Sequence, residues 1–413
     1  LLTLVLLVVL VSTFVLLVVL VSTFVLLVIL VSTLVLLVVL VSTFPLLLIP
    51  VLTLITKDVL KSMIIIVHNI ALLELIIGGR STKVPDSVDH LRPGDIDVVG
   101  AIGDSLTAGA AIFSTNLIQL LVENRGVSAF AGGQGTWREF LTIPNILKEF
   151  NPNLVGYAYA DSLTTNEASQ FNVAFSGAIS EDMPHMAKFL IRRIKNHPRV
   201  NFKKDWKLVS MMIGANDFCS YICASPSPRS ILKYHKTHLM EVLRIFRDNL
   251  PRTVVAVIPP PNLKQLVTAR KRKHTLSCYL ATNVECSCMF GLMHAQNREK
   301  YYEIMKRWQE LEEEIVNLPE FHTKDFTALY LPTLKQSGVP IAEDGFADMT
   351  YLAEDCFHVS QKSNARLSNG IWNNLLEPIG NKSETWLPLF EKFLCPTPER
   401  SYLVTRGNSG GRK

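Results

Sequence analysis

The stretch that decides the fold runs from residue 95 to residue 109 and reads DIDVVGAIGDSLTAG. Its apolar, β-branched first half predicts a buried strand, because such side chains fill positions covered on both faces of a sheet. The strand is expected to stop at Gly103, where a tight turn passes the chain to a helix. Ser105 would then lie exposed at the junction, well placed to attack a bound group. A plain helix cap by Asp104 or Ser105 is the structural alternative.

The spacing around Ser105 disfavours the α/β-hydrolase fold, whose elbow reads Gly-x-Ser-x-Gly, because the second position after Ser105 is Thr107. Further along, strands alternate with helices. Strands are predicted over 171–175, 206–213, 254–258 and 326–331, and helices near 118–122, 186–194, 230–249, 296–316 and 371–375. This alternation predicts an α/β fold with a parallel sheet covered on both faces. In such sheets function gathers at the carboxyl ends of the strands.

Residues 1–56 form an apolar segment built on a near-perfect decapeptide repeat, for example VSTFVLLVVL. A ten-residue step spreads the repeated Ser-Thr pairs around a helix, so the segment has no amphipathic face. Its length suffices for two bilayer crossings of about 20 residues each, which makes it a candidate membrane anchor. The other interpretation is a translated simple-sequence repeat without selected structure. The chain starts at Leu1 rather than methionine, which is consistent with a fragment.

Composition changes divide the rest of the chain into three parts. Residues 57–83 are predicted to be a linker, because their apolar patch is too short and too polar for a bilayer span and then gives way to Gly, Ser and charge. Residues 84–395 are predicted to form one globular domain, and residues 396–413 a polar tail.

Seven cysteines, six of them between Cys219 and Cys356 and the last at Cys395, indicate an oxidising compartment. They suffice for three disulfides and one free thiol, but the sequence does not give the pairing. Cys286 and Cys288 lack the paired knuckles of a zinc site, so we interpret the cysteines as structural.

The formal net charge of +5 is mild and does not indicate a nucleic-acid partner. The region 262–294 is expected to be irregular. Its basic run, residues 270–273, is interpreted as a solvated loop, with contact to anionic headgroups or phosphates as the alternative.

The predicted strand ends and one late loop carry the groups that acyl-ester hydrolysis needs. Ser105 is the candidate nucleophile, and its weakly acidic hydroxyl needs a base within hydrogen-bond reach. His358 is the candidate base, and Asp355 can fix the tautomer of its imidazole. The candidate oxyanion donors are the backbone N–H groups of Ser105 and Gly177 and the side-chain amide of Asn216. Loss of one such donor typically costs ~10²–10³ in kcat.

Four blocks in this order resemble those of the GDSL or SGNH hydrolase family: GDSL at 103–106, Gly177, GAND at 214–217 and DCFH at 355–358. Further stretches resemble its phospholipase B branch, namely RPGDI at 92–96, FNVA at 171–174, DWK at 205–207 and WNNLLEP at 372–378. The resemblance covers residues 84–395, which it identifies as an SGNH/GDSL hydrolase domain.

This resemblance implies a flavodoxin-like three-layer α/β/α sandwich and serine-dependent hydrolysis of acyl esters, with phospholipids and lysophospholipids as substrates. It implies a Ser105–His358–Asp355 triad, oxyanion donors at Ser105, Gly177 and Asn216, and no metal or organic cofactor. We therefore expect a membrane-associated or secreted protein that works at a membrane surface. Phospholipase B proteins are commonly held by a C-terminal span, whereas residues 396–413 are polar, so the mode of anchoring is open. Asn381 begins a glycosylation sequon.

Several alternatives accompany this interpretation. Asp217 or Asp348 could supply the acid in place of Asp355, although Asp217 is better explained as a helix cap. Cys356, between the two triad candidates, is better explained as half of a disulfide or a buried thiol than as a second nucleophile. The alternative functions are a small-ester or carbohydrate esterase of the same fold, or a catalytically silent, membrane-tethered binding protein.

Overall fold

The computed structural model describes residues 79–269 and 275–409. The predicted anchor at 1–56 and the basic run at 270–273 lie outside the described residues. Within the described ranges, the chain has no helix both long and apolar enough to cross a membrane.

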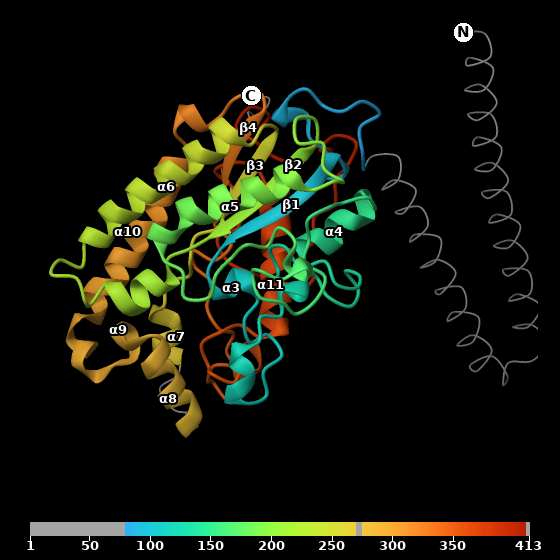
Figure 1. Ribbon diagram of the computed structural model, residues 1–413. Helices are drawn as coiled ribbons and strands as arrows, with labels where there is room; N and C mark the ends of the chain where they lie inside the picture. The colour runs from blue at the N-terminus through green and yellow to red at the C-terminus, as the bar shows by residue number, and fades with distance from the viewer. Residues whose placement is uncertain (1–78, 270–274, 410–413) are drawn as a thin grey trace, which may run out of the picture. The chain divides into compact units, whose positions relative to one another are not determined.

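A four-stranded parallel sheet forms the centre of the fold, with its strands side by side in chain order (Figure 1). The strands are β1 (Ile96–Gly103), β2 (Trp206–Met212), β3 (Thr253–Val257) and β4 (Phe326–Tyr330). Apart from one half-buried position in β1, every strand residue is buried. The continuous apolar runs in the sequence are therefore explained by helices on both faces of the sheet, and the predicted α/β class is confirmed.

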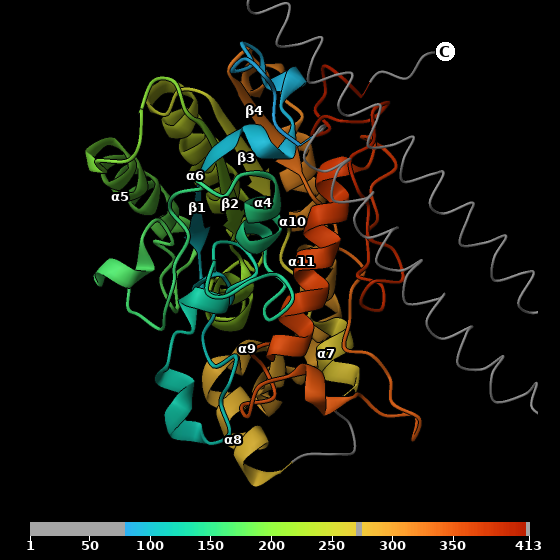
Figure 2. The same ribbon diagram turned by 90° about the vertical axis from the view of Figure 1, so that its right-hand side faces the viewer.

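The helices are α3 (Ser105–Ala108), α4 (Ile143–Phe150), α5 (Met183–Asn196), α6 (Ser230–Asn249), α7 (Lys264–Ala269), α8 (Leu276–Glu285), α9 (Ser287–Phe290), α10 (Arg298–Val316) and α11 (Gln361–Leu376). The helices α5, α6 and α10 pack with one face of the sheet, and α4 and α11 with the other. Figure 2 shows α5 and α11 on opposite sides of the sheet. This is the expected three-layer α/β/α sandwich.

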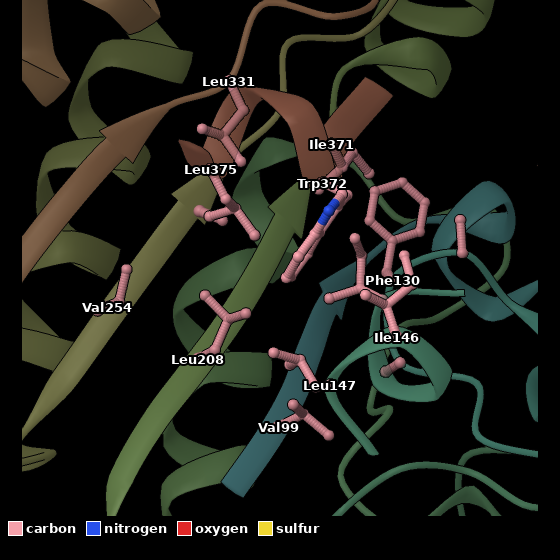
Figure 3. Close-up of a cluster of buried hydrophobic side chains, with 14 of the residues drawn as sticks. Val99, Phe130, Ile146, Leu147, Leu208, Val254, Leu331, Ile371, Trp372 and Leu375 are labelled. Carbon is pink, nitrogen blue, oxygen red and sulfur yellow. The ribbon is translucent and has the colours of Figure 1, made fainter. Parts of the chain in front are cut away.

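Each face of the sheet carries its own apolar core, because neighbouring residues of a strand point to opposite faces. Val98 of β1 joins the core beneath α5 and α6. Its neighbour Val99 joins the core beneath α4 and α11. Figure 3 shows this second core, where Trp372 of α11 lies among Leu147, Leu208 and Leu375. The two cores fix the sheet from both sides and so hold its carboxyl edge in place.

Three local predictions differ from the structure. Residues 171–175 run beside β1 but form a bridge only at Asn172, because the edge of β1 is shared with a second segment at Val155. The region expected to be irregular contains α7, α8 and α9, which are short helices with part of their apolar surface facing solvent. Residues Leu117–Leu121 form a 3-10 helix, η4, whose apolar side chains are not buried in the core.

The two ends of the described chain lie together at the amino end of the sheet. The backbone N–H of Leu403 donates to the carbonyl oxygen of Leu91 at 2.7 Å. The side-chain amide of Asn408 donates to the carbonyl oxygen of Asp89 at 2.8 Å. Both partners directly precede β1, so these contacts lie at the opposite end of the strands from α3 (Figure 1).

Candidate active site

Ser105 lies where β1 ends and α3 begins. Gly103 has a φ of 154°, and a Cβ at this position would collide with the carbonyl oxygen of Met212 and the side chain of Thr107. The carboxylate of Asp104 then caps α3 by accepting from the N–H of Leu106 at 3.0 Å. The predicted turn and cap are thus both present. Residue Ser105 is nevertheless only 8% exposed, so the expectation of an exposed serine is wrong.

A hydrogen-bonded chain joins Ser105 to the late loop. Nε2 of His358 lies 2.8 Å from Oγ of Ser105, and Nδ1 of the same ring lies 2.6 Å from Oδ2 of Asp355. The other oxygen of Asp355 accepts from the N–H groups of Phe357 and His358, at 2.8 and 2.9 Å. These bonds fix the carboxylate of Asp355 and the imidazole of His358 in position relative to each other within one short turn. The structure therefore brings together the three residues that the sequence analysis named.

Charge and burial shift the pKa values of His358 and Asp355 in opposite directions. Burial alone would lower the pKa of His358, but the hydrogen bond and charge of Asp355 outweigh it and raise that pKa above its ordinary value. Burial alone would raise the pKa of Asp355, whereas its hydrogen bonds and the charge of His358 bring it below the usual range. Asp355 is therefore ionised at neutral pH, ready to stabilise an imidazolium.

The two other candidate oxyanion donors lie on neighbouring segments. The N–H of Phe175 donates to the carbonyl oxygen of Gly103, which aligns the Gly177 loop with the end of β1. Gly177 has a φ of 84°, and apart from its two chain neighbours no described residue lies within 4 Å of where its Cβ would be. One N–H of the Asn216 amide donates to the carbonyl oxygen of Ala178 at 2.9 Å. An amide has two such hydrogens, so the second is available to a ligand.

The acidic alternatives have other partners. Asp217 accepts from the backbone N–H of Ser180 at 3.1 Å, and burial raises its pKa to about 7. Asp348 accepts from the N–H of Thr350 at 3.0 Å and pairs with Lys362 at 3.2 Å. Asp355 is the acid that is hydrogen-bonded to the ring of His358.

Two carboxyl groups near His358 had no part in the sequence-based site. Asp104 is fully buried, and burial raises its pKa to about 6. Glu285, the last residue of α8, places Oε2 4.0 Å from Nδ1 of His358. Glu285 could not be singled out from the sequence, because it lies in a region predicted to be irregular and approaches His358 only through the tertiary fold. The one sequence feature that could have pointed to Glu285 is its position next to Cys286.

One group within the described ranges has metal-ligand geometry, namely Glu285, Asp355 and His358, with ligand atoms within 4.8 Å of one another. Both ring nitrogens of His358 are already within hydrogen-bond distance of Asp355 and Ser105. A metal ion bound through this ring would have to displace one of these partners, so the arrangement fits proton transfer better than metal binding.

Three disulfides hold the site together: Cys219–Cys286, Cys223–Cys288 and Cys278–Cys356. Cys395 is unpaired. The number of bridges agrees with the prediction, and Cys356 is part of a bridge and not a free thiol. Because Cys356 lies between Asp355 and His358, the third bridge ties α8 directly to the loop that carries both.

An apolar pocket adjoins these residues. Three of its lining side chains are direct neighbours of candidate site residues: Leu106 follows Ser105, Ala215 precedes Asn216, and Phe357 precedes His358. The remaining wall is largely aliphatic and includes Leu263, Leu266, Leu334, Val339 and Leu367. The pocket encloses about 770 Å³, counting its open mouth. Such a lining suits a hydrocarbon chain.

Comparison with known proteins shows the family of this chain. The family model described as GDSL-like lipase/acylhydrolase matches residues 99–371. The chain belongs to the GDSL lipase/acylhydrolase family. This family is one of carboxylic ester hydrolases, and the resemblance seen in the four sequence blocks is thereby confirmed.

Two curated relatives of this GDSL chain are named "Phospholipase B1, membrane-associated". The protein from Homo sapiens is 37% identical over 335 residues, and that from Rattus norvegicus 36% over the same length. Each alignment covers 80% of this chain and 22% of the relative. The chain therefore spans about a fifth of the length of these relatives. A solved phospholipase A1 from Streptomyces albidoflavus NA297 is 12% identical and covers 65% of this chain and 95% of its own, with a TM-score of 0.30.

Proposed function

We propose that this GDSL chain hydrolyses the acyl esters of phospholipids and lysophospholipids, with Ser105 as nucleophile. The observation that carries the proposal is the relay from Ser105 through His358 to Asp355, at 2.8 and 2.6 Å. Both distances are within the reach that proton transfer requires.

The reaction would proceed in two halves. Nε2 of His358 takes the proton of the Ser105 hydroxyl as Oγ bonds to the ester carbonyl carbon. The resulting oxyanion accepts hydrogen bonds from the N–H groups of Ser105 and Gly177 and from the amide of Asn216. His358 then protonates the departing alcohol, which leaves an acyl-serine. A water molecule, deprotonated by His358, attacks the acyl-serine, and His358 returns this proton to Oγ of Ser105 as the fatty acid leaves.

The apolar pocket supports a lipid acyl group as the substrate class. A carbohydrate esterase would need polar partners for sugar hydroxyls, whereas the pocket wall next to Ser105 is mainly apolar. A silent binding protein would have no need of an ionised Asp355 aligned on His358. We further propose a secreted or membrane-associated protein, because three disulfides are typical of oxidising compartments. Glycosylation of exposed Asn381 stays a prediction.

The test uses the full chain with its disulfides intact. We expect a fluorophosphonate probe to label Ser105, and lysophosphatidylcholine to release fatty acid faster than an acetylated sugar releases acetate. Peptide mass spectrometry locates the label. Labelling without lipid hydrolysis would favour the small-ester or carbohydrate esterase. A folded protein that is neither labelled nor active on any ester would favour the binding protein.

We expect the negative charge of Glu285 to raise the pKa of His358, the proposed general base. Its carboxylate, 4.0 Å from the ring, is one of the charges that raise the pKa of His358. His358 must be neutral to accept the Ser105 proton, so the rate rises with pH as the ring loses its proton. In Glu285→Gln we therefore expect the acidic limb of the kcat/KM profile to shift to lower pH, with a plateau changed less than about tenfold.

The pH dependence of short-chain ester hydrolysis measures this shift. Glu343→Gln removes an exposed carboxylate elsewhere and serves as the matched control. An unchanged profile in Glu285→Gln, or an equal shift in both variants, would show that Glu285 does not act on His358.

A further inference from the structure

We propose that an exposed apolar face beside the active site docks onto the surface of a lipid bilayer or micelle. This rim face consists of exposed side chains from η4, from α8 and from the 3-10 helix η9 (Leu292–Asn297): Leu117, Ile118, Leu121, Leu276, Leu280, Val284, Leu292 and Met293. Ile118 and Leu121 are each 82% exposed, Val284 is 84% exposed and Met293 85%. Large apolar side chains this exposed and this clustered mark an interaction surface.

The orientation of α8 is the reverse of that in an ordinary surface helix. Leu276, Leu280 and Val284 recur every four residues and so share one face, and that face is turned to solvent. The opposite side carries Cys278 and Thr282, both fully buried. A surface helix normally turns its apolar stripe toward the core. In α8 the helix is held by a disulfide instead, which leaves the apolar stripe free for a partner.

Covalent and hydrogen bonds connect the rim face to the proposed site. Cys278 of α8 is bonded to Cys356, between Asp355 and His358. On the η4 side, Oγ of Ser114 accepts from the backbone N–H of Glu354 at 3.2 Å. Figures 1 and 2 both place η4, the teal turn, beside α8 and on the α3 side of the sheet. A surface that contacts the rim face is therefore brought next to Ser105.

The charge pattern favours lipid over a protein partner. No Asp, Glu, Lys or Arg occurs from residue 105 to residue 122, although such residues make up 19% of the chain. From residue 275 to residue 297 the single one is Glu285, whose carboxylate is turned toward His358. Protein interfaces usually have a polar rim that fixes register. Two exposed apolar segments with so few charged residues instead suit insertion among acyl chains, where a charge would be costly.

This inference rests on the proposed function, because docking next to Ser105 delivers lipid esters directly to the apolar pocket. Leu266 and Leu352 line that pocket and belong to or pack against the same cluster as the buried side of α8. An acyl chain leaving a bilayer beneath the rim face would therefore meet apolar contacts on its way to Ser105.

Two double variants test the rim face, Ile118→Ser with Leu121→Ser and Leu280→Ser with Val284→Ser. The matched control replaces two exposed apolar residues outside it, Val84 and Ile379, with serine. For each protein, hydrolysis of phosphatidylcholine vesicles is divided by hydrolysis of a soluble short-chain ester. We expect this ratio to fall roughly tenfold or more in both rim variants, since each lost side chain weakens apolar burial, and to stay within about twofold in the control.

A second readout reports contact locally, whatever else holds the chain to lipid. In Val284→Trp we expect brominated phosphatidylcholine to quench the added indole fluorescence, and in Val84→Trp to leave it unquenched. Equal quenching in both, or unchanged ratios in the rim variants, would overturn the docking proposal. A dimer that dissociates in the rim variants, without quenching, would make the face a contact between copies and also overturn it. Quenching in a protein that hydrolyses no ester would sustain docking and refute the proposed function.

Discussion

Ser105→Ala is expected to lower kcat/KM for lysophosphatidylcholine by roughly 10⁴–10⁶ while leaving the fold intact. The hydroxyl forms the covalent bond to the acyl group in the proposed reaction, and no other side chain can supply it at that position. The hydroxyl is hydrogen-bonded to His358 at 2.8 Å but contributes little volume to the core. Fatty acid release measures the effect, and an unchanged melting temperature shows that the fold is preserved.

The matched control is Ser227→Ala, which removes an exposed hydroxyl. We expect full activity and full fluorophosphonate labelling from this variant, and neither from Ser105→Ala. A Ser105→Ala protein that kept a tenth of its activity would show that the nucleophile is elsewhere. Because a contaminating esterase could leave a small residual rate, labelling and hydrolysis should be followed in the same preparation.

Asp355→Asn is expected to lower kcat by roughly 10⁴. The carboxylate accepts from Nδ1 of His358 at 2.6 Å, which leaves Nε2 without a proton and able to accept one from Ser105. An asparagine amide can turn an N–H toward Nδ1, and the ring proton then moves to Nε2. The imidazole would face Ser105 as a donor, so the hydroxyl would lose its base while the shape of the site stayed nearly the same.

Asp348→Asn is the informative control, since Asp348 is the other acid shortly before His358 in the sequence. Its carboxylate pairs with Lys362 and accepts from Thr350, so we expect activity within about twofold of the unmodified chain. Soluble-ester hydrolysis by the two variants makes the comparison. A greater loss in Asp348→Asn than in Asp355→Asn would reverse the proposed roles.

Local chemistry explains which features could be predicted from the sequence. The run that ends in Gly103 fixes a buried strand and a turn that tolerates no Cβ, so the position of Ser105 follows from nearby residues alone. Asp355 and His358 are three residues apart, so one short turn can join them, as it does in the structure. The alternating strands and helices predicted the parallel sheet for the same reason, because hydrophobic period is a local property.

Features that depend on tertiary contacts were not predictable. The pairing of Cys278 with Cys356 spans 78 residues, and spacing does not determine it. Helix α8 was missed because the disulfide, and not an apolar core-facing stripe, holds it in place. Glu285 approaches His358 only through that helix. For this reason, neither the carboxylate of Glu285 nor the rim face could be recognised from the sequence of residues 262–297.

The meeting of Leu403 with Leu91 makes the domain suitable for insertion into a longer polypeptide. Since both ends of the fold emerge at the amino end of the strands, a polypeptide can enter and leave on one side while the pocket opens on the other. Several such domains could follow one another in tandem, each with its pocket opening on the side away from the linkers.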